Sequence, residues 1–153
     1  MVTTAEDDLH GARLRITRPR IAVLTEVYAH PHADVETIAA AARARLGSVS
    51  TQAVYDVLRV LTDVGLVRHI EPAGSVARFE ARVGDNHHHL VCRHCGAIED
   101  VDGAAGQTPC LEPSDHRGFA VDEAEVTYWG ICSSCKQFDD IPTDSSTIDG
   151  RHT

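Results

Sequence analysis

The segment HHHLVCRHCG, residues 87–96, contains three consecutive histidines and then a Cys-x-x-Cys pair, Cys92 and Cys95. The chain repeats that cysteine spacing at Cys132 and Cys135. Each pair can present two sulfurs to one ion, and four thiolates complete a tetrahedral Zn²⁺ shell without leaving a position for a substrate. The alternative is a redox dithiol or disulfide, which the duplicated spacing and a reducing compartment disfavour. The four cysteines therefore predict a structural zinc site.

The three histidines offer nitrogen ligands, which are harder than thiolates, and they predict a second metal site. On a strand, side chains two residues apart face the same side, so His87 and His89 share one face while His88 lies on the other. A pair of imidazoles needs further ligands from elsewhere in the chain. The candidates are His32, Glu80 and Asp100. The alternative is a solvated histidine run, and His88 either ligates another ion or is solvated.

Upstream of this segment, the first eighty residues have helical periodicity. Suitable N-cap residues begin three helices, at Thr17, Asp34 and Ser50. Gly47 ends the second helix and Gly65 the third. Apolar residues on the third helix share one face: Val54, Leu58, Leu61 and Val64. Three short helices in series are typical of a helix-turn-helix, although they also occur in ordinary helical domains.

Short strand patterns follow the third helix. Residues 66–70 and 76–79 flank Pro72 and Gly74, which predicts a β-hairpin and hence a winged helix. Further strands are expected at 87–92, 97–101, 119–121 and 125–131, with a turn or helix around Pro109 and Pro113. We therefore expect an α+β chain with a winged helix-turn-helix domain at 1–83, a small metal-binding α/β domain with a four-cysteine zinc site at 84–136 and a disordered acidic tail at 137–153.

The net charge of −9 is divided unevenly along the chain. Residues 1–83 hold ten Arg and ten acidic residues and so are neutral overall, whereas residues 84–153 hold four basic and thirteen acidic residues. A neutral domain can still present a basic face to nucleic acid. The acidic half is equally suited to binding cations.

The cysteine content indicates a reducing compartment, because four of the five cysteines have metal spacing. Cys110 is left without a partner and is expected to be an incidental or buried thiol. No apolar run approaches the roughly 20 residues needed to cross a bilayer, and no hydrophobic signal segment precedes the cysteines. We therefore expect a cytoplasmic protein without a membrane partner.

The start of the third helix carries residues suited to DNA. Its first two turns, where phosphate and base contacts are usually made, contain Ser50, Thr51, Gln52 and Tyr55. Gln52 suits adenine, and Asp56 suits the N4 amino group of cytosine. Arginines around the first helix suit phosphates, although a solvated basic face explains them as well: Arg13, Arg15, Arg18 and Arg20.

Four stretches together resemble the ferric uptake regulator family over residues 10–136. They are STQAVYDVLRVLTDVGLV at 50–67, RFE at 78–80, HHHLVCRHCG at 87–96 and YWGICSSC at 128–135. STQAVYDVL and DEAEVTYWGIC are most similar to the FurA/CatR branch, which the family associates with repression of catalase-peroxidase genes. The resemblance implies a winged helix hinged near residues 80–87 to an α/β dimerisation domain. It also implies a homodimeric repressor that binds palindromic operator DNA when a regulatory metal is present.

In this family the regulatory metal bridges the two domains. The resemblance places its ligands at His32, Glu80, His87, His89 and Asp100. This set of N and O donors suits Fe²⁺ or Mn²⁺, with Zn²⁺ as an in vitro substitute. The zinc-uptake branch usually has a thiolate where Glu80 stands. Peroxide-sensing members often have Asp at this position. The Glu80 of this chain therefore does not decide whether the protein senses peroxide directly.

Two positions depart from the family pattern. Tyr55 is followed by Asp56, where the family commonly has Arg, and this removes a phosphate or guanine contact and leaves the operator sequence open. A third family metal site uses a His where this chain has Ala124. Such a site would therefore need His88 with His116 or an acid.

Other functions compete with the repressor. A zinc-responsive uptake regulator is the alternative within the family. An Fe(II) oxygenase would use His87 and His89 with Glu80 or Asp100 as a 2-His-1-carboxylate triad, and it would need a substrate pocket. A zinc-ribbon interaction module explains the cysteines but not the other ligands. We favour the repressor, without enzymatic activity and without an organic cofactor.

Overall fold

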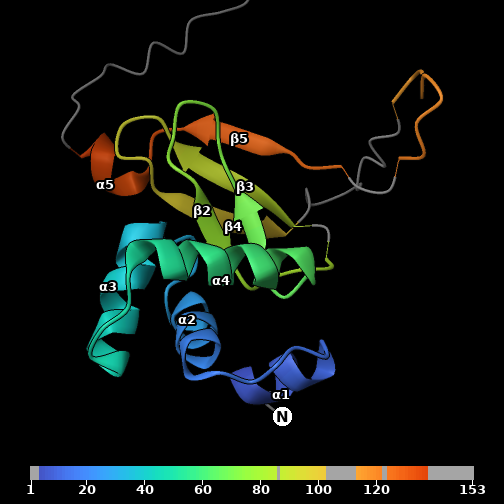
Figure 1. Ribbon diagram of the computed structural model, residues 1–153. Helices are drawn as coiled ribbons and strands as arrows, with labels where there is room; N and C mark the ends of the chain where they lie inside the picture. The colour runs from blue at the N-terminus through green and yellow to red at the C-terminus, as the bar shows by residue number, and fades with distance from the viewer. Residues whose placement is uncertain (1–3, 86, 103–112, 122–123, 138–153) are drawn as a thin grey trace, which may run out of the picture.

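The computed structural model describes residues 4–85, 87–102, 113–121 and 124–137. Helices occupy one end of the molecule and a three-stranded sheet the other, with a two-stranded hairpin between them (Figure 1). The helical end contains α1 (Ala5–Gly11), α2 (Arg18–Ala29), α3 (Val35–Leu46) and α4 (Thr51–Asp63). The hairpin is formed by β1 (Arg68–Ile70) and β2 (Arg78–Glu80). The sheet end contains β3 (His87–Cys92), β4 (Ile98–Asp102), β5 (Thr127–Gly130) and the short helix α5 (Ser133–Lys136). The expected α+β class is confirmed.

The starts of α2, α3 and α4 are those expected from the sequence. The side chains of Thr17, Asp34 and Ser50 each accept a hydrogen bond from the backbone N–H three residues on, at 3.4, 2.8 and 3.0 Å respectively. Each bond satisfies one of the N–H groups that the first turn of a helix leaves unpaired. Gly47 ends α3 with a φ of +84°, which a residue with a Cβ adopts only with strain.

Asp34→Ala is expected to lower the free energy of unfolding by about 1 kcal/mol, because the Thr37 N–H loses its capping partner. Urea unfolding of the zinc-loaded protein, followed by circular dichroism, measures the change. Asp34→Ser is the matched control, since a serine hydroxyl can also cap and should keep most of the stability. Equal destabilisation by both substitutions would contradict the capping role.

Helix α1 was not predicted. The Thr4 hydroxyl accepts from the Asp7 N–H at 3.2 Å, and the Asp7 carboxylate accepts from the Thr4 N–H at 3.2 Å, which together make a capping box. The helix buries Ala5 and Leu9 in the same core cluster as residues of α2. The Thr-x-x-Asp spacing was therefore an available signal for this helix.

The hydrophobic core cluster belongs to the helical end. Phe79 of β2 packs into it, so the hairpin is attached to the helices. On α4 the buried face is the expected one and consists of Val54, Leu58 and Leu61. Val64, which was expected on that face, lies past the end of the helix and is 40% exposed.

The sheet has the order β4-β3-β5, with β3 antiparallel to β4 and parallel to β5. The register places His89 opposite Asp100, and opposed residues share a face of a sheet. Within the described residues of this end, buried apolar side chains are limited to Val91 and Cys92. The sheet end therefore needs a source of stability besides apolar burial.

The strand expected at residues 119–121 was wrong. No strand includes these residues, and Phe119 and Val121 are 75% and 47% exposed. Both edges of β3 are already paired, so a further strand would have to pair with the outer edge of β4 or β5. Alternating apolar residues alone do not specify which edge a strand pairs with. The other expected strands are present, with bounds within two residues of those predicted.

Some expectations lie outside the described residues. They concern the turn or helix around Pro109, the thiol of Cys110 and residues 138–153 of the expected tail. In the part of the chain that the structure describes, no helix combines the length and the apolar character needed to span a bilayer.

Candidate metal centres

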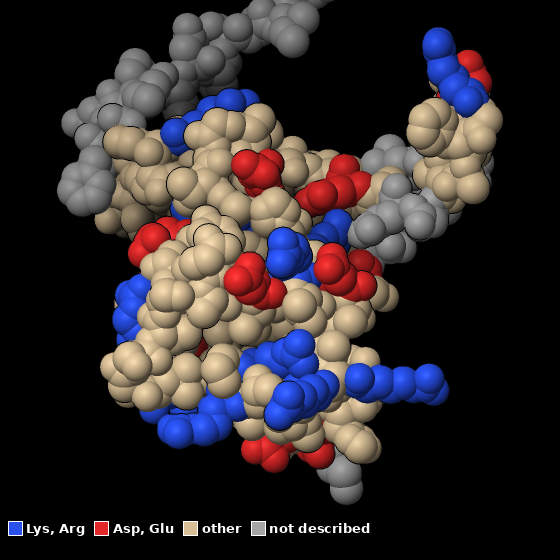
Figure 2. Space-filling view, viewed as in Figure 1, with Lys and Arg blue, Asp and Glu red and all other residues tan. Residues whose placement is uncertain are grey.

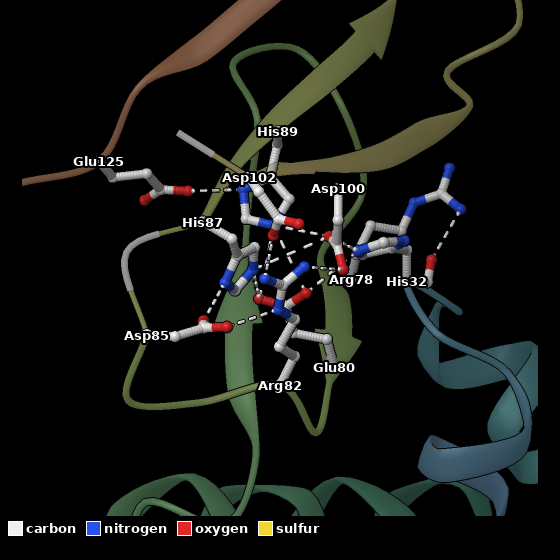
Figure 3. Close-up of polar contacts among 10 residues, drawn as sticks. All are labelled: His32, Arg78, Glu80, Arg82, Asp85, His87, His89, Asp100, Asp102 and Glu125. Carbon is white, nitrogen blue, oxygen red and sulfur yellow. Dashed lines mark hydrogen bonds and ion pairs between the residues drawn. The ribbon is translucent and has the colours of Figure 1, made fainter. Parts of the chain in front are cut away.

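Side chains from four separate elements converge between the hairpin and the sheet (Figure 3). His32 comes from the turn between α2 and α3 and Glu80 from the end of β2, whereas His89 comes from β3 and Asp100 from β4. One potential ligand atom of each lies within 4.8 Å of those of the other three. Two imidazoles and two carboxylates thus form a set of N and O donors at a spacing that one ion can bridge.

Glu80 lies at the centre of these contacts. Its Oε2 is 3.0 Å from His32 Nε2 and 3.4 Å from His89 Nε2. Its Oε1 is 3.0 Å from His87 Nε2. Asp100 Oδ1 is 2.8 Å from the Nε2 of His32, and 3.5 and 3.8 Å from those of His89 and His87. The five residues expected to share a site are therefore brought together, and all three imidazoles present Nε2.

The site is largely buried. The side chains of His87 and His89 are 0% exposed and that of Glu80 is 1% exposed. Burial raises the pKa of Glu80, but the hydrogen bond from His32 and the charges of His87 and His89 outweigh it, so that this pKa lies below its usual value. The hydrogen bond to Glu80 raises the pKa of His32 against the effect of its burial. A buried carboxylate that stays ionised needs a positive partner, which either a protonated imidazole or a metal cation supplies.

The backbone at His32 has an uncommon conformation. Its φ is +61°, which costs a residue other than glycine about 1–3 kcal/mol. Two backbone hydrogen bonds hold this turn against β2: the His32 N–H donates to Phe79 O, and the Phe79 N–H donates to Ala33 O, both at 3.0 Å. Because Glu80 follows Phe79, the strand that holds the turn also carries the carboxylate that His32 contacts.

Two carboxylates that the sequence did not single out lie behind the histidines. Asp85 Oδ1 is 2.5 Å from His87 Nδ1, and Glu125 Oε1 is 3.2 Å from His89 Nδ1. Each therefore contacts the ring nitrogen that points away from Glu80 (Figure 3). No motif marks Glu125, which reaches His89 because β5 pairs with β3.

Arg82 is a third residue that the sequence did not indicate. Its guanidinium pairs with Asp85 at 2.7 Å, with the outer oxygen Oδ2 of Asp100 at 3.4 Å, and with Asp102. Asp100 thus has one oxygen toward the histidines and the other toward Arg82. The segment between β2 and β3 is thereby attached to β4 beside the ligand set.

The four cysteines form a separate cluster at the end of β3. Their sulfurs lie within 4.8 Å of one another, and Cys95 Sγ is 3.7 Å from Cys132 Sγ. Hydrogen bonds from the backbone N–H groups of Cys95 and Cys132 lower the pKa of Cys92 to about 6, whereas hydrogen bonding with Cys132 raises that of Cys135 to about 12. Four sulfurs this close repel one another as thiolates, so all four ionise only around a cation. The donor set fits tetrahedral Zn²⁺.

The residues suggested for a third metal site are not brought into such a cluster. The ring of His88 lies 6.2 Å from that of Tyr128, and its Nδ1 is buried without a hydrogen-bond partner. His116 lies among exposed residues. Within the described ranges, neither histidine belongs to a group of three or more potential ligands. The third site therefore stays a prediction from the family resemblance.

The residues expected to contact DNA lie on the helical end. Tyr55 of α4 is 45% exposed, and Gln52 donates to Asp56 Oδ1 at 3.2 Å. Arg43 of α3 donates to Thr51 Oγ1 at 2.7 Å, which attaches the start of α4 to its neighbour. Polar side chains at the start of α4 are thus exposed or held by neighbours rather than buried in the core.

Basic side chains also gather on this end. Figure 2 shows basic side chains, drawn in blue, grouped over the lower, helical part of the face in view, and the only Lys of the chain is Lys136 in α5, so these are arginines. Arg18 and Arg20 lie in the first turn of α2, and Arg20 donates to the backbone oxygen of Arg15 at 2.8 Å. The helical end thus offers positive charge, although the whole chain is acidic.

Known proteins resemble this chain in both sequence and fold. The sequence model that describes the ferric uptake regulator family matches residues 11–129. The chain is 65% identical over 129 residues to the transcriptional regulator FurA of Mycobacterium tuberculosis, a match that covers 84% of this chain and 88% of the relative. Its fold is similar to that of the Helicobacter pylori ferric uptake regulator, at a TM-score of 0.69 and 20% identity over 86% of this chain and 88% of that one. The Pseudomonas aeruginosa ferric uptake regulator, solved with manganese, gives a TM-score of 0.67 and 25% identity over 86% of this chain and 99% of that one.

Proposed function

This chain belongs to the ferric uptake regulator family, with its similarity pointing to the FurA branch, and we propose that it is a homodimeric repressor that binds a palindromic operator when its regulatory site holds a divalent metal. As a member of the family it is a metal-responsive transcriptional regulator. We assign DNA binding to residues 1–83 and metal binding with dimerisation to residues 84–136.

The origin of the converging donors carries this proposal. His32 and Glu80 belong to the helical end and its hairpin, whereas His87, His89 and Asp100 belong to the sheet end. The five side chains point inward together at the angle between the two ends that this structure has. A divalent ion bound by all of them favours that angle, because its affinity for the other arrangements is lower. This is the property of a switch whose DNA-binding end responds to metal.

We propose Fe²⁺ or Mn²⁺ for the His and carboxylate site and Zn²⁺ for the cysteines. Imidazole and carboxylate donors suit the first two ions, and the thiolates suit the third. The manganese in the Pseudomonas aeruginosa relative supports this choice. Zn²⁺ also accepts N and O donors, so we expect it to substitute in vitro. A zinc-responsive uptake regulator is therefore the alternative within the family.

We propose that α4 is the recognition helix. Asp56 takes one amide N–H of Gln52, which leaves the second N–H and the carbonyl oxygen for a base. A glutamine used in this way suits adenine. The further contacts are assigned to Ser50, Thr51 and Tyr55 on this helix and to Arg18 and Arg20 on α2.

The targets we propose are catalase-peroxidase, oxidative-stress or iron genes, and the site of action is the cytoplasm. The 65% identity to FurA of Mycobacterium tuberculosis supports this branch of the family. Peroxide sensing is a further part of the proposal. Peroxide sensing requires that peroxide abolish the DNA binding of the iron-loaded form and not that of the forms loaded with other metals.

The oxygenase reading is disfavoured by the same geometry. Such an enzyme holds iron with three protein ligands and keeps positions open for O2 and substrate. Here five donors converge, which leaves little of an octahedral shell free. Turnover of an organic substrate by the iron-loaded protein would revive that reading.

A gel-shift experiment with the DNA upstream of the protein's own gene tests the proposed function. Protein with zinc on its cysteines alone is compared with protein given Fe²⁺ without oxygen, Mn²⁺ or additional Zn²⁺, and peroxide is then added. We expect Fe²⁺ or Mn²⁺ to induce DNA binding. If the protein senses peroxide directly, peroxide should abolish the DNA binding of the iron-loaded form and leave that of the manganese-loaded form unchanged. DNA binding that responds only to additional Zn²⁺ would establish the zinc-responsive alternative.

A further inference from the structure

Glu125 contacts both a histidine of the regulatory site and the hairpin. We propose that Glu125 is a positioning residue, which aims His89 at the regulatory metal and connects that ligand to the hairpin through Arg68. The inference rests on the proposed function, since it concerns the same metal. Glu125 lies just before β5, which pairs with the strand that carries His89.

The contact with Glu125 gives the Nδ1 N–H of His89 an acceptor when Nε2 binds the regulatory metal. Glu125 Oε1 is 3.2 Å from His89 Nδ1. A neutral imidazole carries a single N–H, so when Nε2 gives its lone pair to the regulatory metal the proton lies on Nδ1, where the ionised carboxylate of Glu125 accepts it. His89 Nε2 is the atom that faces Glu80 and Asp100. The His89 side chain is 0% exposed and that of Glu125 is 39% exposed, so Glu125 covers His89 on the side that faces solvent.

Glu125 is placed behind the ligand rather than among the ligands. The imidazole ring of His89 separates the carboxylate from Nε2, and Figure 3 shows Glu125 on the outer side of that ring. Glu125 is also absent from the four-residue group whose ligand atoms lie within 4.8 Å of one another. Carboxylates in this position orient metal-binding histidines and make them more basic.

The second oxygen of Glu125 connects the site to the hairpin. Glu125 Oε2 is 3.6 Å from the guanidinium of Arg68, whose side chain is 18% exposed. Arg68 is directly opposite Glu80 in the pairing of β1 with β2, so the two side chains share a face of the hairpin. The hairpin therefore reaches His89 by two routes, through Glu80 and through Arg68 with Glu125.

These two routes have different consequences. Glu80 binds the metal, so its removal abolishes the site. Glu125 is expected to act in a graded way: without it the His89 ring can rotate or change tautomer, and the hairpin loses one attachment to the sheet. Metal affinity and the metal-induced change in DNA affinity should therefore both fall while the other ligands stay in place.

The test uses the full chain with zinc on its cysteines. Mn²⁺ dissociation constants are measured by competition with a chelating dye, and Co²⁺ absorption reports the geometry of the regulatory site. We expect Glu125→Ala to weaken Mn²⁺ binding about 10–100-fold and to alter the Co²⁺ spectrum. Glu125→Gln should recover part of the affinity, because its amide oxygen can still accept from Nδ1. Arg68→Gln should affect Mn²⁺ affinity less than Glu125→Ala and should reduce the metal-induced gain in DNA affinity.

Two control variants separate the possible results. Glu99→Gln removes the same charge from β4 at a position opposite Leu90, on the other face of the sheet from His89, and should leave Mn²⁺ affinity at the native value. His89→Ala should abolish Mn²⁺ binding at the regulatory site. If His89→Ala abolishes binding and Glu125→Ala does not weaken it, the inference is wrong while the proposed site stands. If neither weakens it, the proposed site itself is wrong. If Glu99→Gln and Glu125→Ala weaken Mn²⁺ binding equally, the loss is explained by the change in net charge, and the inference is also wrong.

Discussion

Cys92→Ser is expected to release the zinc and to unfold the sheet end of the molecule. The hydrophobic core cluster lies at the helical end, and the described part of the sheet end buries little apolar surface besides Val91. A structural Zn²⁺ contributes about 10–16 kcal/mol in small domains that depend on it, so losing one of four sulfurs removes the main source of stability there. We expect the variant to contain no zinc by mass spectrometry and to elute as a monomer with reduced strand signal. A zinc-loaded dimer with native circular dichroism would rule out this role.

Cys110→Ser is the matched control for that substitution. It makes the same chemical change at the cysteine that has no Cys-x-x-Cys partner. We expect it to keep the zinc and the dimer. Loss of zinc from both variants would show that the four-cysteine assignment is incomplete.

His89→Ala is expected to keep the zinc and the dimer and to lose DNA binding induced by Fe²⁺ or Mn²⁺. The imidazole is fully buried between Glu80 and Glu125, and its removal takes away a ligand and leaves both carboxylates with one partner fewer. We expect Mn²⁺ binding at the regulatory site to be abolished, a larger effect than the about 10–100-fold loss that follows removal of an outer-shell partner. Size-exclusion chromatography and gel shifts over a range of Mn²⁺ concentrations measure the two properties separately.

His10→Ala is the control for this loss, since His10 is an exposed residue of α1 and belongs to neither group of potential metal ligands among the described residues. It should respond to Mn²⁺ as the native chain does. The contrast between the two metal sites is the sharper test: if His89→Ala and Cys92→Ser change size and DNA affinity alike, the division into a structural and a regulatory site is wrong.

Local rules were sufficient to predict most of the fold. Thr17, Asp34 and Ser50 cap helices because their side chains reach N–H groups only three residues away, so the neighbouring sequence determines the contact. The same holds for the cysteine pairs and for the shared face of His87 and His89. The strand expected at 119–121 failed because pairing depends on which edges of the sheet are free, which is not a local property.

The candidate site was predictable only in its inner part. The family resemblance indicated the five inward-facing donors, and the geometry brings them together. Asp85, Arg82 and Glu125 were missed, because a lone charged residue before a strand or in a connecting segment is usually a solvated surface residue. Their partners become apparent only when the register of β3 with β4 and β5 is known.

The short segment that joins the hairpin to the sheet affects the equilibrium by which the metal site assembles. His87 follows Glu80 by seven positions, yet the two side chains meet at 3.0 Å. A tether this short gives each half of the site an effective concentration for the other on the order of millimolar. Assembly of the site is therefore intramolecular, and its equilibrium does not depend on how much protein is present. The free-metal concentration that half-fills the site is thus expected to stay the same when the intact dimer is diluted.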